Sequence, residues 1–200
     1  MTTSTTDRSW TFTILRALPA AAVALVITFM SDHSALLGYL ALAVFAVVTG
    51  VVIGVAALRG IYPRTSFLAQ GALLAIGGVL ALAFSQAGLP FLLFLVSALF
   101  GVTGIIELVA GLRARGRAAA ARDWVFVGAL SALFAIAVLL IPVDFVQTIT
   151  IPDKVVPPLT ASVILVGLLG AYAAIVAVYL VIAGLSLKWA PRTSTAVSEG

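Results

Sequence analysis

Six stretches of the chain consist almost entirely of apolar residues, and short polar stretches separate them. We place them at Ile14–Met30, Leu36–Leu58, Phe67–Phe84, Pro90–Leu112, Trp124–Ile141 and Leu159–Leu187. Each is close to the ~20 residues that an α-helix needs to cross a bilayer. The apolar residues are continuous, whereas the strands of a membrane barrel alternate apolar and polar side chains. The pattern therefore predicts six transmembrane helices.

Composition gives the same answer. The 200 residues are 63% hydrophobic and only 9% charged, whereas a soluble domain carries about a quarter charged residues. In lipid every backbone N–H and C=O must be satisfied within the protein, which favours helices. The predicted fold class is all-α, a polytopic membrane bundle of six transmembrane helices. We expect this domain to span residues 14–188, between polar cytoplasmic tails at 1–13 and 189–200, with the first apolar stretch retained as an uncleaved helix.

The cationic residues are concentrated at one end of the predicted helices. One set of loops and tails carries Arg8, Arg16, Arg59, Arg64, Arg113, Arg115, Arg117, Arg122, Lys188 and Arg192. The opposite loops carry Lys154 beside Asp32, Asp144 and Asp153. Cytoplasmic loops of membrane proteins are enriched in Arg and Lys, so both termini are expected in the cytoplasm. Because topology accounts for the basic residues, nucleic acid is not an expected partner.

The second and fourth apolar stretches also resemble each other. A shift of 54 residues without a gap aligns Val48–Val52 with Val102–Ile106, and Val55–Arg59 with Val109–Arg113. A weaker third copy includes Gly128–Leu130. These matches predict three tandem two-helix hairpin repeats. Such repeats are parallel, whereas many secondary transporters contain inverted ones, so the pattern argues against a transporter without excluding it.

One block resembles a known family. In order along the chain it contains Thr103–Leu108 before the basic loop, Trp124, a helix centred on Gly128, and Ile141 with Pro142. Together with the short two-helix repeats, this block resembles the HdeD family of bacterial acid-resistance membrane proteins, whose short repeat has no known function. The likeness covers most of residues 14–188 and is best over 70–142. It departs at Ile53, which stands at the position of Glu107, and in a long loop before the last helix. The resemblance implies a small plasma-membrane protein associated with acid or envelope stress, and it brings no catalytic residues.

Glu107 is the ionisable residue that lies well inside a predicted helix. An intramembrane carboxyl is costly and is a functional candidate for that reason. It could bind a proton or cation in a small-solute or proton transporter or channel. Alternatively it is structural, bonded to Thr103, to a neighbouring helix or to the basic loop, with Arg59 and Arg113 as the expected cationic partners. In the structural case, which we favour, we expect Glu107→Gln to fold and function almost normally.

Glycines and arginines supply two further sets of candidates. Gly50, Gly54, Gly104 and Gly111 are candidates for close helix packing, because small residues let membrane helices approach. We expect this packing within one chain rather than across a dimer. Candidates for contact with anionic lipid head groups are Arg113, Arg115, Arg117 and Arg122.

Other chemistry receives little support from the sequence. The chain has no cysteine and one histidine, His33 in an outer loop, which could sense external acid. No common catalytic or nucleotide-binding motif occurs, so we expect no enzyme, no cofactor and no metal site. Expected partners are the lipid bilayer and either a second copy of the chain or another membrane protein, for which this chain could be an accessory subunit.

Overall fold

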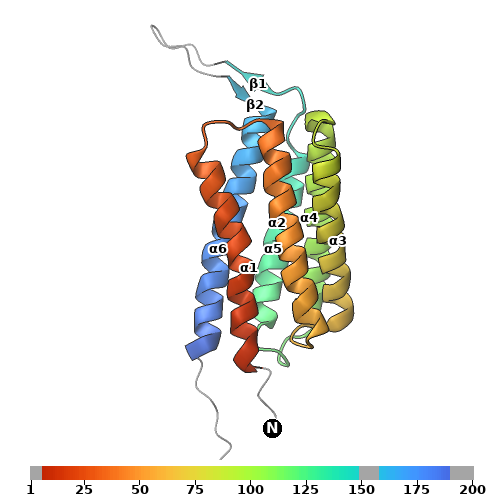
Figure 1. The fold of residues 1–200 in the computed structure, drawn as a ribbon, viewed down its shortest axis with the longest axis vertical. Helices are drawn as coiled ribbons and strands as arrows, with labels where there is room; N and C mark the ends of the chain where they lie inside the picture. Colours follow the sequence, from red (N-terminus) through yellow and green to blue (C-terminus); the bar gives the residue numbers. More distant parts are fainter. Residues whose placement is uncertain (1–5, 149–157, 190–200) are drawn as a thin grey trace, which may run out of the picture.

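The computed structural model describes residues 6–148 and 158–189, and this part of the chain forms a bundle of six helices (Figure 1). The helices are α1 (Thr6–Phe29), α2 (Ala35–Leu58), α3 (Arg64–Ala83), α4 (Gly88–Arg113), α5 (Ala121–Leu139) and α6 (Ala161–Trp189). Each is long and apolar enough to cross a membrane. The predicted all-helical bundle is confirmed.

The first helix differs most from the expectation. It begins at Thr6 rather than Ile14, so the described part of the predicted N-terminal tail is helical. A helix satisfies its own backbone hydrogen bonds, so it can continue past the apolar stretch that sets the predicted boundary. Residues 1–5, and residues 190–200 of the predicted C-terminal tail, lie outside the described part of the chain.

A short antiparallel ladder was not predicted. Strand β1 (Val146–Gln147) pairs with β2 (Leu159–Thr160), with Val146 opposite Thr160. The ladder lies just before α6, at the end of the bundle opposite to where α1 begins (Figure 1). The backbone N–H of Ala161 then donates to the carbonyl of Phe145 over 3.0 Å. Asp153 and Lys154 of the predicted outer loop lie outside the described residues.

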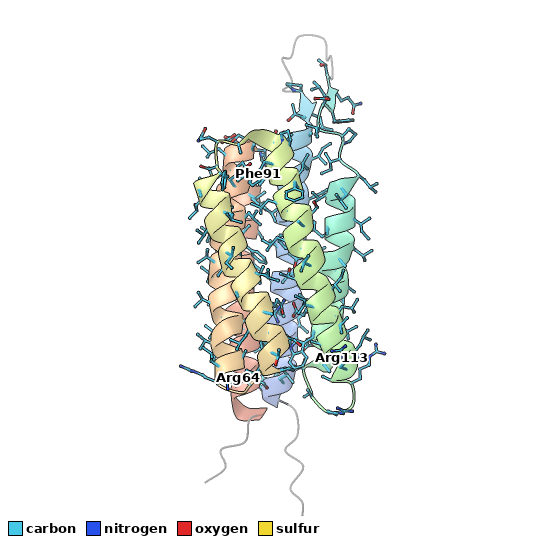
Figure 2. All side chains as sticks on the ribbon, turned by 90° about the vertical axis from the view of Figure 1, so that its right-hand side faces the viewer. Arg64, Phe91 and Arg113 are labelled. Atoms are coloured by element: carbon cyan, nitrogen blue, oxygen red, sulfur yellow. The ribbon has the colours of Figure 1, made fainter. Side chains whose placement is uncertain are left out.

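Both α1 and α6 have their terminal ends at the same end of the bundle, as six crossings require (Figure 1). Arg64 and Arg113 mark this end, and Phe91 lies near the other (Figure 2). We call the end that carries Arg64 and Arg113 the arginine end. The most extensive helix contacts are α4 with α5, α2 with α3, and α1 with α6. These pairs differ from the hairpins α1–α2, α3–α4 and α5–α6 implied by the repeat, and the three tandem repeats stay a prediction.

The outer surface of the bundle is apolar. Large hydrophobic side chains remain exposed on every helix, including Leu25 and Val51 on the first two and Leu133 and Val178 on the last two. Apolar surface of this extent is stable in contact with lipid but not with water. The chain is a multi-pass membrane protein.

Glycines set the closest helix approaches. A Cβ on Gly50 would lie 2.6 Å from the carbonyl oxygen of Gly71, and one on Gly104 would lie 2.9 Å from the backbone nitrogen of Ala132. Gly111 likewise faces the backbone of α5, where a Cβ would lie 2.7 Å from the nitrogen of Val125. A Cβ on Gly54 would have no neighbour within 4 Å, although the Gly54 backbone lies against Gly71. Gly50, Gly104 and Gly111 therefore pack against the backbones of neighbouring helices.

Candidate functional site

Polar side chains from all six helices line one small internal cavity. They are Arg16 on α1, Thr49 on α2, Gln70 on α3, Thr103 and Glu107 on α4, Ser131 on α5 and Tyr172 on α6. We call these residues the polar layer. The cavity measures about 20 Å³, and every residue that lines it is buried. The layer is therefore an internal feature of the bundle.

Glu107 is held by two other helices. The Nη2 atom of Arg16 donates to its Oε1 over 2.7 Å, and the Nε2 atom of Gln70 donates to its Oε2 over 2.7 Å. Arg16 and Glu107 are only 4% and 2% exposed. A carboxylate and a guanidinium that are both desolvated persist when each neutralises the other. The pair and the Gln70 bond join α1, α3 and α4.

The expected partners of Glu107 are corrected by this geometry. Arg59 follows the last residue of α2, where its guanidinium lies 5.7 Å from the centre of the Phe12 ring. Arg113 is exposed in the last turn of α4, about 9 Å along the axis from Glu107 at about 1.5 Å per residue. The Thr103 hydroxyl donates to the Leu99 carbonyl over 2.6 Å. Arg16, which the sequence analysis used only to assign orientation, lies at the depth of Glu107 instead.

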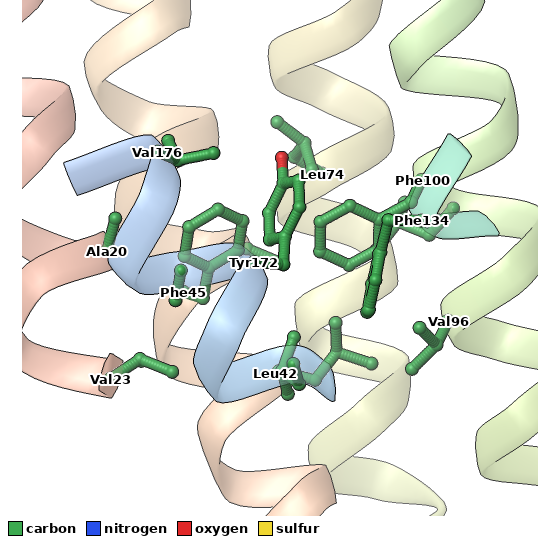
Figure 3. Packing of buried hydrophobic residues seen from close by; sticks show 14 of the residues in the cluster. Ala20, Val23, Leu42, Phe45, Leu74, Val96, Phe100, Phe134, Tyr172 and Val176 are labelled. Carbon is green, nitrogen blue, oxygen red and sulfur yellow. The ribbon is translucent and has the colours of Figure 1, made fainter. Parts of the chain in front are cut away.

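An aromatic cluster borders the polar layer on the side away from the arginine end. The rings of Phe45, Phe100, Phe134 and Tyr172 gather in the centre of the bundle (Figure 3). Phe134 stacks on Tyr172 with centroids 4.8 Å apart, and Phe100 meets both rings edge-on at 4.9 and 5.0 Å. The Tyr172 hydroxyl lies 2.8 Å from that of Ser131. Apolar rings therefore cover this side of the layer.

A second aromatic cluster lies toward the arginine end. Tyr62, in the α2–α3 turn, packs against Phe67 and Trp124 at 5.0 and 5.3 Å. Phe67 and Trp124 are themselves 4.8 Å apart. Burial raises the pKa of Tyr62 above its usual value, so this hydroxyl stays neutral beside Arg16. Buried rings thus lie on both sides of the polar layer along the bundle axis.

Three buried polar atoms of the layer have no partner within the described structure: Nε of Arg16, Oγ1 of Thr49 and Oε1 of Gln70. All three residues line the same cavity. Buried polar atoms are nearly always hydrogen-bonded in folded proteins. These three atoms therefore mark a place where the network is incomplete.

The loop arginines lie apart from this layer. Arg113, Arg115, Arg117 and Arg122 are all exposed. Arg113 and Arg117 line a surface groove of about 320 Å³ with Pro63 and Ser66, between the start of α3 and the end of α4. Arg122 lines a separate groove of about 300 Å³, in which Asp123 accepts a hydrogen bond from Tyr179. These four arginines are therefore surface residues at the arginine end of the bundle.

His33 is in the α1–α2 loop, at the end opposite to the arginines. Its Nδ1 lies 3.3 Å from the carbonyl oxygen of Ser31. Its neighbour Asp32 accepts from both the backbone N–H and the hydroxyl of Ser34, which caps α2. The loop geometry is accounted for by this cap, and His33 makes no contact with the polar layer.

Sequence reasoning missed most of the polar layer. Two of its seven residues, Glu107 and Thr103, were singled out. The other five were not: Arg16, Thr49, Gln70, Ser131 and Tyr172. Gln70 could have been found, because it is a lone amide among apolar residues three positions into a predicted helix.

Comparison with known proteins adds nothing to the assignment: the chain matches no protein-family model, no curated protein and no solved structure.

Proposed function

We propose that the chain is a small non-catalytic protein of the HdeD type, which acts in a bacterial plasma membrane during acid or envelope stress. The stress role rests on the sequence resemblance. The non-catalytic role rests on the bonding of Glu107, whose two oxygens are occupied by Arg16 and Gln70. A carboxylate engaged in this way holds helices together rather than acting on a substrate.

The same geometry argues against the alternative, a proton or small-solute pathway through Glu107. The Arg16 guanidinium repels cations at the carboxylate it neutralises. Aromatic clusters cover the layer on both sides, and a cavity of about 20 Å³ has no room for a solute larger than water. What favours the alternative is that a carboxyl and a phenol, Glu107 and Tyr172, line one cavity.

The stress role can be tested by deleting the gene from the source bacterium. We expect deletion to lower survival after acid or envelope challenge, and a plasmid copy to restore it. Growth of both strains should be equal without challenge. Equal survival of the deletion strain and the parent under both challenges would contradict the proposed role.

Orientation is tested by labelling. Because the chain has no cysteine, single cysteines can be introduced as Ser34→Cys in the α1–α2 loop and Ala118→Cys in the α4–α5 turn. With both termini in the cytoplasm, an impermeant thiol reagent should label Ser34→Cys in intact cells and Ala118→Cys only after permeabilisation. The reverse pattern would invert the proposed topology.

We further infer that the groove of Arg113 and Arg117 contacts anionic head groups. A cation near an anionic membrane surface contributes about 1 kcal/mol, so removing both should lower retention of phosphatidylglycerol about 30-fold. Native mass spectrometry of Arg113→Gln/Arg117→Gln would measure this, with Arg59→Gln as a control outside the groove. Equal lipid retention by the double variant and the control would argue against a site there.

The same spectra report assembly. A monomer mass would agree with the intrachain glycine contacts. A dimer would place a second copy on the apolar surface, and an additional protein would favour the role of accessory subunit.

A further inference from the structure

We propose that the cavity of the polar layer is a binding site for one water molecule, which Arg16, Thr49 and Gln70 hold as a fixed part of the bundle. The site goes beyond the proposed function, because a core water would be required whether or not the protein acts in stress. Three features support this site: the unpartnered atoms, the size of the cavity and the charges around it.

The three unpartnered atoms determine which hydrogen bonds the ligand must donate and accept. Nε of Arg16 is a donor, Oε1 of Gln70 is an acceptor, and the Thr49 hydroxyl can be either. Flipping the Gln70 amide would not give every polar atom a partner, because its nitrogen would then lose the 2.7 Å hydrogen bond that it donates to Glu107. The ligand must therefore accept one hydrogen bond and donate another.

The size of the cavity restricts the ligand further. A buried water needs about 10–15 Å³ of free volume and two to four polar partners. The cavity has about 20 Å³, and the three atoms supply three partners. One water fits, and two do not.

Charge excludes the simple ions. A cation would lie beside the buried Arg16 guanidinium and would find no free carboxylate oxygen, because both Glu107 oxygens are engaged. An anion would face Oε1 of Gln70 and the negative charge of Glu107. Water is neutral and both donates and accepts, so it offers the kind of hydrogen bond that each of the three atoms needs.

The bound water would extend the network of the layer. Glu107 already connects α4 to α1 and α3. The water adds α2 through Thr49 and gives Arg16 and Gln70 a second shared partner. Four helices are then joined by one continuous set of hydrogen bonds in the part of the bundle that lipid surrounds.

Thr49→Val tests the site because the sign of its effect on the melting temperature depends on whether water is bound. Valine keeps the shape of threonine and removes the hydroxyl. If water is bound, the substitution removes one of its hydrogen bonds, and the melting temperature in detergent should fall by about 2–4 °C. If the cavity is dry, the substitution removes an unsatisfied buried hydroxyl, and the melting temperature should rise.

Thr103→Val is the matched control. Thr103 lines the same cavity and is equally buried, but its hydroxyl is already bonded to Leu99 of its own helix. Its substitution should change the melting temperature less than Thr49→Val does. A melting temperature of Thr49→Val equal to or above that of the wild type would overturn the proposal.

A structure at a resolution that shows ordered water gives an independent answer. One density peak within hydrogen-bonding distance of Arg16 Nε, Thr49 Oγ1 and Gln70 Oε1 is expected. An empty cavity, or a melting temperature that rises with sodium or chloride concentration at constant ionic strength, would overturn the assignment to water.

Discussion

Replacing Glu107 with alanine should destabilise the protein severely, by about 3–5 kcal/mol. Alanine removes the carboxylate to which Arg16 and Gln70 donate. It leaves a buried guanidinium with no counter-charge inside the hydrocarbon region, where an unpaired charge is most costly. We expect a lower melting temperature in mild detergent and less protein in the membrane.

Glu107→Gln should be destabilised nearly as much, which reverses the expectation from the sequence. Glutamine keeps the shape of glutamate but not its charge, so Arg16 again lacks a counter-ion. Arg16→Gln should behave similarly, because it leaves the carboxylate unpaired. Asp123→Asn is a suitable control, since this carboxylate is partly exposed and its partner is the neutral Tyr179. A Glu107→Gln protein that melts like the wild type would show that the ion pair does not hold the bundle.

Gly128→Ala should also disrupt the fold. A Cβ at this position would lie 2.4 Å from the backbone nitrogen of Leu108 and 2.8 Å from the carbonyl oxygen of Gly104. Because the obstacle is backbone, no side-chain rotation can relieve it, and α4 and α5 must separate. Overpacking of this kind costs about 1–3 kcal/mol. We expect a lower melting temperature and, since α4 carries Glu107, a weakened polar layer.

Two glycines serve as controls for this substitution. A Cβ on Gly54 would meet nothing within 4 Å, and one on Gly101 would make an ordinary contact of 3.6 Å with Ala135. The free energies of unfolding of Gly54→Ala and Gly101→Ala should therefore lie within about 0.5 kcal/mol of the wild-type value. A Gly128→Ala protein as stable as these two would show that the α4–α5 approach is looser than described.

The helices could be predicted because their signal is local. Continuous apolar runs of membrane-spanning length predict helices whatever their neighbours are. The predicted start of the first helix was wrong because polar residues continue the helix back to Thr6, and hydropathy does not register backbone hydrogen bonds. The β1–β2 ladder was missed because two residues on each side leave no periodic pattern.

The partner of Glu107 could not be predicted because it is 91 residues away in sequence. The repeat suggested Arg59 and Arg113, which occupy equivalent positions at helix ends. Pairing depends instead on which helix faces α4 at the depth of Glu107, and local sequence does not encode this. An arginine two residues inside the first apolar stretch was a usable signal, since Arg16 could have been read as a buried charge that needs a carboxylate.

The most direct test of the account is acid survival of cells that carry the double variant Arg16→Leu/Glu107→Leu. This variant replaces the ion pair with apolar side chains and leaves no unpaired charge, a change that is often neutral or stabilising for buried pairs. The Gln70 amide loses its carboxylate acceptor, which costs less than an unpaired buried charge. If the pair only holds the bundle, the double variant should melt well above Glu107→Gln and protect cells as well as the wild type does. Loss of protection at wild-type protein level and melting temperature would contradict the account, because Glu107 would then be required for chemistry rather than for assembly.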